Sequence, residues 1–234
     1  MRSLSIAGLL VPLVLPLTAA CGRDEAASGA APAASPAAVP AAGGAESASA
    51  LLRDDFSDPA SGWTVRDRGD YRNEYADGRY VLRVDNARSP YVSNVAYREG
   101  ELGDVRIEVD ATRLAGAPSA GVGIDCRRAG AAGAGTYYGD VDAEGNARIV
   151  AHGEEQEVLV EIERQGLWRD GANRLRLDCV GDELSLWLNG ERLLSTHDDR
   201  YRRGRIGLRA GGGSDEPTEV AFDDLLVTAP GAGS

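Results

Sequence analysis

The sequence predicts an all-β domain made of two packed antiparallel sheets, and three observations predict it. From Leu51 onward, apolar and polar residues alternate with a period of two, as Val105, Ile107 and Val109 do with the charged residues between them. Turn signals separate the alternating runs, and no helical stripe of apolar residues is present. Strands with one apolar face bury that face against a second sheet.

The alternating runs are short and follow one another at regular spacing. Several breaks between them carry residues that favour the tight turns of β-hairpins, among them Asp77-Gly78, Asp170-Gly171 and Asn189-Gly190. The runs lie at residues 79–85, 91–97, 104–111, 121–127, 146–152, 157–162, 174–179, 184–189, 205–210 and 219–228.

The first twenty-one residues have the features of an export signal. Met1-Arg2 gives a positively charged start. Residues 4–17 are almost wholly apolar, but this run is shorter than a typical transmembrane helix. The residues Leu17-Thr18-Ala19-Ala20-Cys21 resemble the lipobox of bacterial lipoproteins, in which the cysteine is acylated and becomes the N-terminus; Thr18 stands where the family prefers Leu. The alternative is an ordinary signal peptide followed by a free cysteine.

These features divide the chain into four parts. We expect a lipoprotein signal peptide over 1–20, lipidated Cys21 with a disordered tether over 21–50, a folded domain over 51–229 and a disordered tail over 230–234. The tether is rich in Ala, Pro, Gly and Ser and cannot bury enough apolar surface to offset the entropy of ordering it. The resemblance implies an exported protein, lipid-anchored at the cell surface on the outer face of the cell membrane or, in a Gram-negative cell, on the outer membrane.

The acidic composition narrows the range of partners. The formal net charge is −12 at pH 7. Nucleic acid requires a basic footprint that releases counterions, and anionic lipid headgroups also attract basic surfaces. We therefore expect no nucleic-acid partner, and contact with the membrane through the lipid anchor only.

Three segments of the C-terminal half resemble a known family. Residues 173–182 form an alternating strand that leads into Leu184-Ser185-Leu186-Trp187-Leu188-Asn189-Gly190. Then follow Gly204-Arg205-Ile206-Gly207-Leu208 and Val220-Ala221-Phe222-Asp223-Asp224-Leu225. This order resembles concanavalin A-like, laminin G-like jelly rolls. The resemblance implies a concanavalin A-like jelly-roll sandwich of two antiparallel sheets. That fold carries lectins, hydrolases and adhesive modules alike.

Two cysteines are left in the folded part of the chain. Cys126 lies in phase with Ile124, and Cys179 lies in phase with Leu177, so both point to the apolar side of their strands. In an exported protein such a pair favours a disulfide. The alternative is two buried free thiols.

The sequence contains few signs of catalysis. Laminarinase-type glycoside hydrolases, which share the expected fold, carry an E-x-D-x-x-E strand that places two carboxylates across the sugar bond. Here the nearest match has Glu108 and Asp110, but Arg113 replaces the third acid. The C-terminal half is also similar to 3-keto-disaccharide hydrolases, yet no catalytic residue of that family maps onto this chain. We assign no catalytic residue.

Two features favour binding. Asp55 and Asp223 resemble the structural calcium site of related jelly rolls, where the first and last strands meet, and carboxylate oxygens suit Ca²⁺. The alternative is a solvated acidic edge. Trp187 and one of Tyr137 and Tyr138 fall out of phase with the apolar faces, so they are candidates to stack on a sugar ring, or else they are structural strand residues.

These observations predict a surface lipoprotein whose jelly roll binds a glycan or another cell-envelope component without catalysis. Two alternatives stay open. One is a glycoside hydrolase-like enzyme of the 3-keto-disaccharide hydrolase type, and the other is a module that contacts a protein or acts as a spacer.

Overall fold

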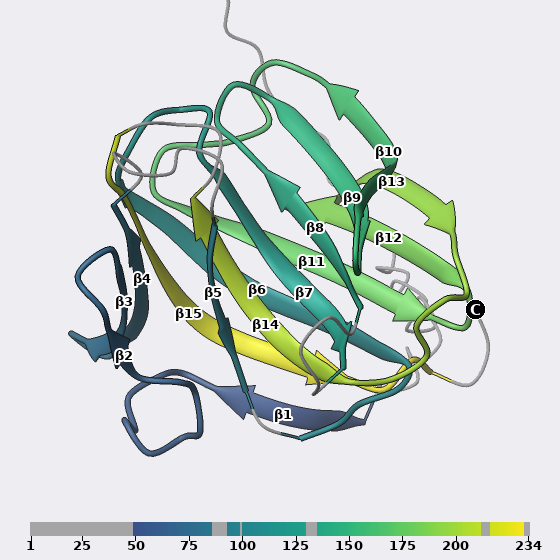
Figure 1. Ribbon diagram of the computed structural model, residues 1–234, viewed down its shortest axis with the longest axis horizontal. Coiled ribbons are helices and arrows are strands. Elements are labelled where there is room, and N and C mark those ends of the chain that lie inside the picture. The colour runs from purple at the N-terminus through teal and green to yellow at the C-terminus, as the bar shows by residue number, and fades with distance from the viewer. Residues whose placement is uncertain (1–48, 86–92, 99, 130–134, 212–215, 232–234) are drawn as a thin grey trace, which may run out of the picture. The chain divides into compact units, whose positions relative to one another are not determined.

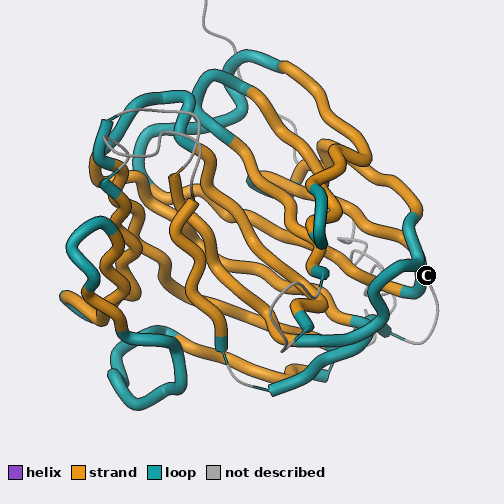
Figure 2. The backbone as a smooth tube through the Cα atoms, viewed as in Figure 1, coloured by secondary structure: helices purple, strands orange, loops and turns teal. Residues whose placement is uncertain are grey.

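The computed structural model describes residues 49–85, 93–98, 100–129, 135–211 and 216–231. The predicted signal peptide, Cys21 and nearly all of the tether lie outside the described residues, as do the last three residues of the tail. Every regular element of the described part is a β-strand (Figure 2). No helix in these ranges is long and apolar enough to cross a membrane. The predicted all-β class is confirmed.

The strands form two antiparallel sheets that lie one behind the other (Figure 1). The larger sheet has nine strands, and β1 pairs with β15 beside the main path. In spatial order its strands are β13 (Glu191–His197), β12 (Glu183–Leu188), β11 (Ala172–Val180), β6 (Val105–Ala115), β15 (Thr218–Thr228), β4 (Arg79–Val84), β3 (Tyr71–Ala76) and β2 (Arg66–Asp67), with β1 (Ala50–Asp54).

The smaller sheet has six strands and is the nearer layer in Figure 1. Strands distant in sequence lie side by side in it, since β14 pairs with both β5 and β7. Its spatial order is β10 (Gln156–Glu163), β9 (Asn146–His152), β8 (Thr136–Val141), β7 (Gly121–Arg128), β14 (Arg205–Gly211) and β5 (Ser93–Tyr97).

The core lies between the two sheets and follows the predicted alternation. Along β6, Val105, Ile107 and Val109 are fully buried while the residues between them are half-exposed. Leu177 contributes from β11, the neighbour of β6 in the same sheet, and Ile124 contributes from β7 of the opposite sheet. Each strand thus turns one face inward, and the opposite faces are left for solvent or a ligand.

A disulfide joins the two sheets. Cys126 on β7 and Cys179 on β11 are bonded, 53 residues apart in the sequence. Both side chains are fully buried in the core. The structure therefore contains the pair expected from strand phase.

Two of the predicted hairpin turns have the required backbone. Asp77 and Gly78 connect β3 to β4 with φ values of 53° and 71°. Asn189 and Gly190 connect β12 to β13 with φ values of 52° and 85°. Positive φ at both central residues is the mark of the type I′ turn, which Asn-Gly and Asp-Gly favour.

Candidate functional site

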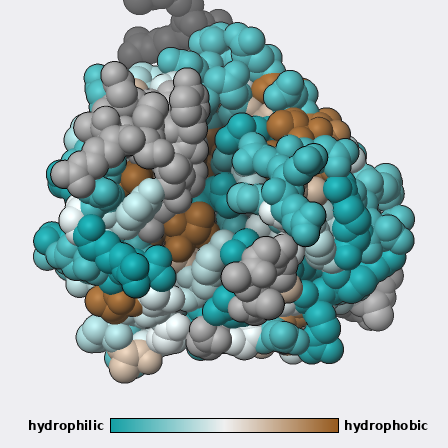
Figure 3. Space-filling view, in the orientation of Figure 1, coloured by the Kyte–Doolittle hydropathy of each residue, from teal (hydrophilic) through white to brown (hydrophobic). Residues whose placement is uncertain are grey.

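The outer face of the six-stranded sheet carries buried charges and aromatic rings in two adjacent rows. Residues paired in register across neighbouring strands share a face of the sheet. The first row runs from β5 to β9 as Tyr97, Gly207, Asp125, Tyr138 and Val150. The second row runs from β14 to β10 as Arg209, Gly123, Asp140, Arg148 and Glu161. Figure 3 views this face, which is largely hydrophilic where it is coloured.

A buried ion pair connects the two rows. Arg209 donates from Nε and Nη2 to the two carboxylate oxygens of Asp125, at 2.7 and 3.1 Å. The two side chains are 8% and 0% exposed. Burial disfavours the charged form of Arg209, but the carboxylate of Asp125 prevails, so the pKa of Arg209 is raised. Because both side chains are buried, loss of either one would leave the charge of the other buried and uncompensated.

Arg209 also covers an aromatic ring. Its guanidinium carbon lies 3.4 Å from the centre of the Tyr138 ring, and the guanidinium of Arg148 lies 5.9 Å from it. Arg148 is held in turn by two bonds to Asp140, at 2.8 and 3.0 Å. Tyr138 is only 1% exposed, and burial raises the pKa of its hydroxyl. The face therefore offers arginine and carboxylate groups where the sequence suggested an open ring.

Tyr97 forms the other end of the first row. Its hydroxyl donates to Asp125 at 3.2 Å, and burial raises its pKa. The ring lies against Gly207, where an added Cβ would come within 2.7 Å of Cδ1. The guanidinium carbons of Arg128 and Arg205 lie 5.3 and 5.4 Å from the ring centre. A half-buried ring with two cations over it thus adjoins the buried ion pair.

His152 lies on β9, opposite Thr136 of β8. Burial lowers the pKa of His152, and the nearby charges of Arg209 and Arg128 lower it further, against a smaller opposing effect of Asp125. The imidazole is therefore disposed to be neutral at pH 7.

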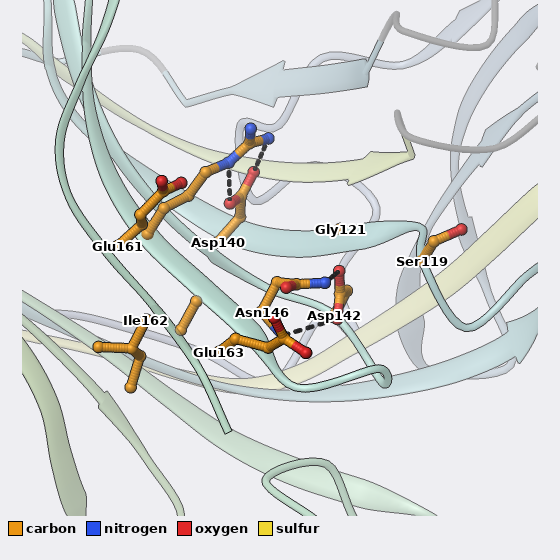
Figure 4. A pocket seen from close by; sticks show the side chains of 10 residues that line it. Ser119, Gly121, Asp140, Asp142, Asn146, Glu161, Ile162 and Glu163 are labelled. Atoms are coloured by element: carbon orange, nitrogen blue, oxygen red, sulfur yellow. Dashed lines mark hydrogen bonds and ion pairs between the residues drawn. The ribbon is translucent and has the colours of Figure 1, made fainter. Parts of the chain in front are cut away.

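A hollow of about 500 Å³ adjoins the other end of the two rows. Figure 4 shows Asp140 and Glu161 on one side of it, and Asp142, Asn146 and Glu163 on the other. Asp142 is engaged by the backbone N–H groups of Gly145 and Asn146 and by the Asn146 side chain. The hollow is thus lined by hydrogen-bonding groups, some already committed to the protein and others, such as Glu161 and Glu163, exposed.

The predicted aromatic residues are not gathered into one site. Tyr137 faces the core and is fully buried; its hydroxyl donates to Asp198 and accepts from the backbone N–H of Tyr201, so it anchors that loop. A buried ring whose polar end is occupied cannot stack on a sugar, and the assignment of Tyr137 to ligand binding is corrected. Tyr138 does face outward, but Arg209 occupies its ring.

Trp187 lies on the other sheet. It is on β12, and the guanidinium carbons of Arg176 and Arg192 lie 4.3 and 5.9 Å from its ring. Its outward direction agrees with its phase in the sequence. It contributes nothing to the face that carries Tyr97 and Tyr138, because the two outer faces are on opposite sides of the sandwich.

The acidic residues that resemble a hydrolase strand lie on the outer face of the nine-stranded sheet. Arg174 of β11 bonds both Glu108 and Asp110 of β6, at 3.4 and 3.2 Å. Arg113 donates to the carbonyls of Ala117 and Ala120, which holds the β6–β7 connection. Glu108, Asp110 and Arg113 thus all have partners within the protein.

The two predicted calcium ligands have other partners. Asp55 accepts from the backbone and hydroxyl of Ser57, and Asp223 accepts from the backbone of Asp224. Asp55 lines a hollow of about 760 Å³ together with Asp224 and Arg174, whereas Asp223 does not line it. Within the described ranges, no three His, Cys, Asp or Glu side chains are grouped to hold a metal ion. Calcium binding at Asp55 and Asp223 stays a prediction, without a coordinating set in these ranges.

Apart from Tyr138, the residues of the two rows were not predicted from the sequence. The sequence shows only that they point away from the core, because Asp125 separates two core residues of one alternating run and Arg209 separates two of another. Their pairing depends on strands 84 residues apart. Periodicity cannot reveal such long-range register.

No protein-family model matches the chain, and no curated protein matches it. Solved structures match in fold. The carbohydrate-binding module CBM66 from Bacillus subtilis aligns with a TM-score of 0.57 at 17% identity, over 72% of this chain and 96% of that chain. A galectin-like protein of unknown function from Bacillus subtilis gives 0.60 at 12%, over 76% and 95%.

Catalytic domains match equally well. The endo-1,3-beta-glucanase (laminarinase) domain from Thermotoga petrophila RKU-1 aligns with a TM-score of 0.56 at 12% identity, over 79% of this chain and 98% of that chain. The fold is a concanavalin A-like jelly roll. At these identities the likeness establishes the fold alone, since the same jelly roll carries binding modules and hydrolases.

Proposed function

We propose that this domain is a non-catalytic glycan-binding module whose site is the outer face of the six-stranded sheet. The observation that carries the proposal is a network on that face, in which buried Asp125 and Arg209 support Tyr97, and Asp140 holds the partly exposed Arg148. Planar guanidinium groups and carboxylates held in fixed positions suit the vicinal hydroxyls of a sugar, because each offers paired donors or acceptors. The similarity to a carbohydrate-binding module supports the same class of ligand.

The network is rigid before any ligand arrives. Asp125 and Arg209 fix each other, and Asp140 fixes Arg148 while leaving 40% of the Arg148 side chain exposed. Groups that are already ordered lose little entropy on binding. Arg148 stands between the ring of Tyr138 and the hollow, and we assign it the central contact with the glycan.

The test is a glycan array with the purified chain, followed by titration of each hit. Arg148→Gln should weaken binding by about tenfold, the effect of losing a charge-assisted hydrogen bond worth roughly 1.4 kcal/mol. Arg176→Gln is the matched control, because Arg176 also bonds an aspartate twice and also lies over an aromatic ring, but on the opposite sheet.

The variants separate the possible outcomes. Loss with Arg148→Gln and retention with Arg176→Gln supports the assignment of the face. The reverse pattern would move the site to the Trp187 face, and an array without hits would favour a protein-contact or spacer role. Release of product from any bound glycan would establish hydrolysis instead.

Hydrolysis is the second candidate function, and one observation favours it. The hollow beside Arg148 is lined by four carboxylates, those of Asp140, Asp142, Glu161 and Glu163. Glycoside hydrolases act with two carboxylates at a fixed separation. Asp140 and Asp142 are engaged by Arg148 and Asn146 here, so the pair that remains is Glu161 and Glu163. Their replacement by Gln should abolish any product release that wild type gives.

We further propose that the chain is exported and anchored by an acyl group on Cys21. The apolar run and the small residues before Cys21 support this. Cells producing Cys21→Ser should release the protein from the membrane fraction. Retention of this variant as tight as that of wild type would contradict the lipid anchor.

A further inference from the structure

The arginines of the candidate face differ in how they are neutralised. Arg209 is bonded twice by Asp125, and Arg148 is bonded twice by Asp140. The side chain of Arg128 makes no hydrogen bond or ion pair with any residue that the structure describes, and its Nε atom is buried without a partner. The guanidinium carbon of Arg128 lies 5.3 Å from the centre of the Tyr97 ring. A buried donor on a guanidinium is costly to leave unmatched, so the position calls for an acceptor.

The surroundings of Arg128 specify which acceptor fits. Arg205 places a second guanidinium carbon 5.4 Å from the centre of the same ring. Burial lowers the pKa of His152, and the charges of Arg209 and Arg128 lower it further. Asp125 is the acidic group at this end, and it is already held by Arg209. The guanidinium of Arg128 is therefore left without a bonded carboxylate beside this pair, in a chain whose net charge is −12.

We propose that Arg128, over the Tyr97 ring, binds a carboxylate of the glycan, so that the module selects acidic glycans. This rests on the proposed glycan-binding function. A carboxylate presents two oxygens that match the fork of a guanidinium, whereas a neutral hydroxyl leaves the charge uncompensated. The remaining acidic surface does not prevent this, because exposed charges beyond about 8 Å are screened at physiological ionic strength.

The two ends of the face then have separate tasks. Arg148 and the hollow contact sugar hydroxyls, and Arg128 reads the acidic substituent. Loss of Arg128 should remove the preference for the acidic glycan while leaving the binding of its neutral counterpart in place. Loss of Arg148 should weaken both.

The experiment is calorimetric titration of the purified chain with matched pairs of oligosaccharides. Oligogalacturonate, alginate and hyaluronan fragments are each compared with their methyl-esterified or carboxyl-reduced forms. Wild type should bind the acidic member of at least one pair about tenfold more tightly than the neutral member. Arg128→Gln should equalise the two. Arg192→Gln is the control, because Arg192 also lies over an aromatic ring, that of Trp187 on the other sheet.

A conservative variant guards against loss of the fold. Arg128→Lys keeps the charge but not the planar fork, and we expect it to retain part of the preference. Equal binding of acidic and neutral members by wild type, or a preference that survives Arg128→Gln, would overturn the inference and leave the glycan-binding function standing. Absence of binding to every acidic and neutral glycan would overturn the proposed function, and this inference with it.

Discussion

The buried pair of Asp125 and Arg209 allows a quantitative prediction. Asp125→Asn keeps the size of the side chain but removes its charge, and it leaves the guanidinium of Arg209 in a position that is 8% exposed. The substitution also weakens the bond from Tyr97, which donates to Asp125 at 3.2 Å. We expect a large loss of stability, because a buried charge without its partner is among the most costly defects in a fold.

The magnitude follows from two independent arguments. Two unit charges about 4 Å apart attract by about 4 kcal/mol at an effective dielectric constant of about 20. Removal of one partner from a buried pair costs about 3–5 kcal/mol. With a denaturant slope of about 2 kcal/mol per molar urea, the midpoint of unfolding should fall by about 2 M. The second substitution Arg209→Met should recover part of this loss, since it removes the unpaired charge.

The assay is urea denaturation followed by circular dichroism, with an exposed pair as control. Arg164 and Glu191 are also bonded twice, at 2.6 and 2.8 Å, but their side chains are 50% and 56% exposed. Glu191→Gln should leave the midpoint unchanged within error. If Asp125→Asn shifts the midpoint no more than Glu191→Gln does, burial does not set the strength of the pair and the argument fails.

Three further predictions concern the disulfide, the histidine and a glycine. Replacing Cys126 and Cys179 by Ala should cost up to roughly 4 kcal/mol by the entropy of a loop of this length, and equal stability of wild type with and without reductant would contradict that. Because the pKa of His152 is lowered on folding by burial and by Arg209 and Arg128, its contribution is fully present above about pH 6.5 and is lost as pH falls toward the folded value; His152→Gln should flatten this part of the stability profile. Gly207→Ala should displace the Tyr97 ring and weaken glycan binding, whereas unchanged affinity would show that the ring is not part of the site.

The sequence predicted the fold well where one face of a strand is exposed. The run at 174–179 lies within β11, whose residues alternate between buried and half-buried, and the Asp77-Gly78 and Asn189-Gly190 turns have the expected backbone. It gave no such signal for β8, because all six residues of Thr136–Val141 are buried. The core covers one face of that strand, and the arginines over Tyr138 help to cover the other, so the alternation disappears.

The site was predicted less well than the fold, for a geometric reason. Alternation shows whether a side chain faces the core, but it does not show which sheet carries the strand. Trp187 and Tyr138 were both candidates to stack on a sugar, and they lie on opposite outer faces. The pairing of Asp125 with Arg209 depends on the register of β7 against β14, which no local pattern encodes.

The two outer faces use the same residue types, and they differ in how deeply the charged pairs are buried. On the nine-stranded sheet, Arg174 and Arg176 neutralise nearby carboxylates in half-exposed positions, as on an ordinary solvated face. On the six-stranded sheet, an aspartate and an arginine are fully desolvated beneath an outer face, where apolar residues of similar volume would be at least as stable. Stability alone does not favour that arrangement. Rigid placement of charged groups for a polar ligand does, and the unmatched guanidinium of Arg128 beside the pair points to the charge of that ligand.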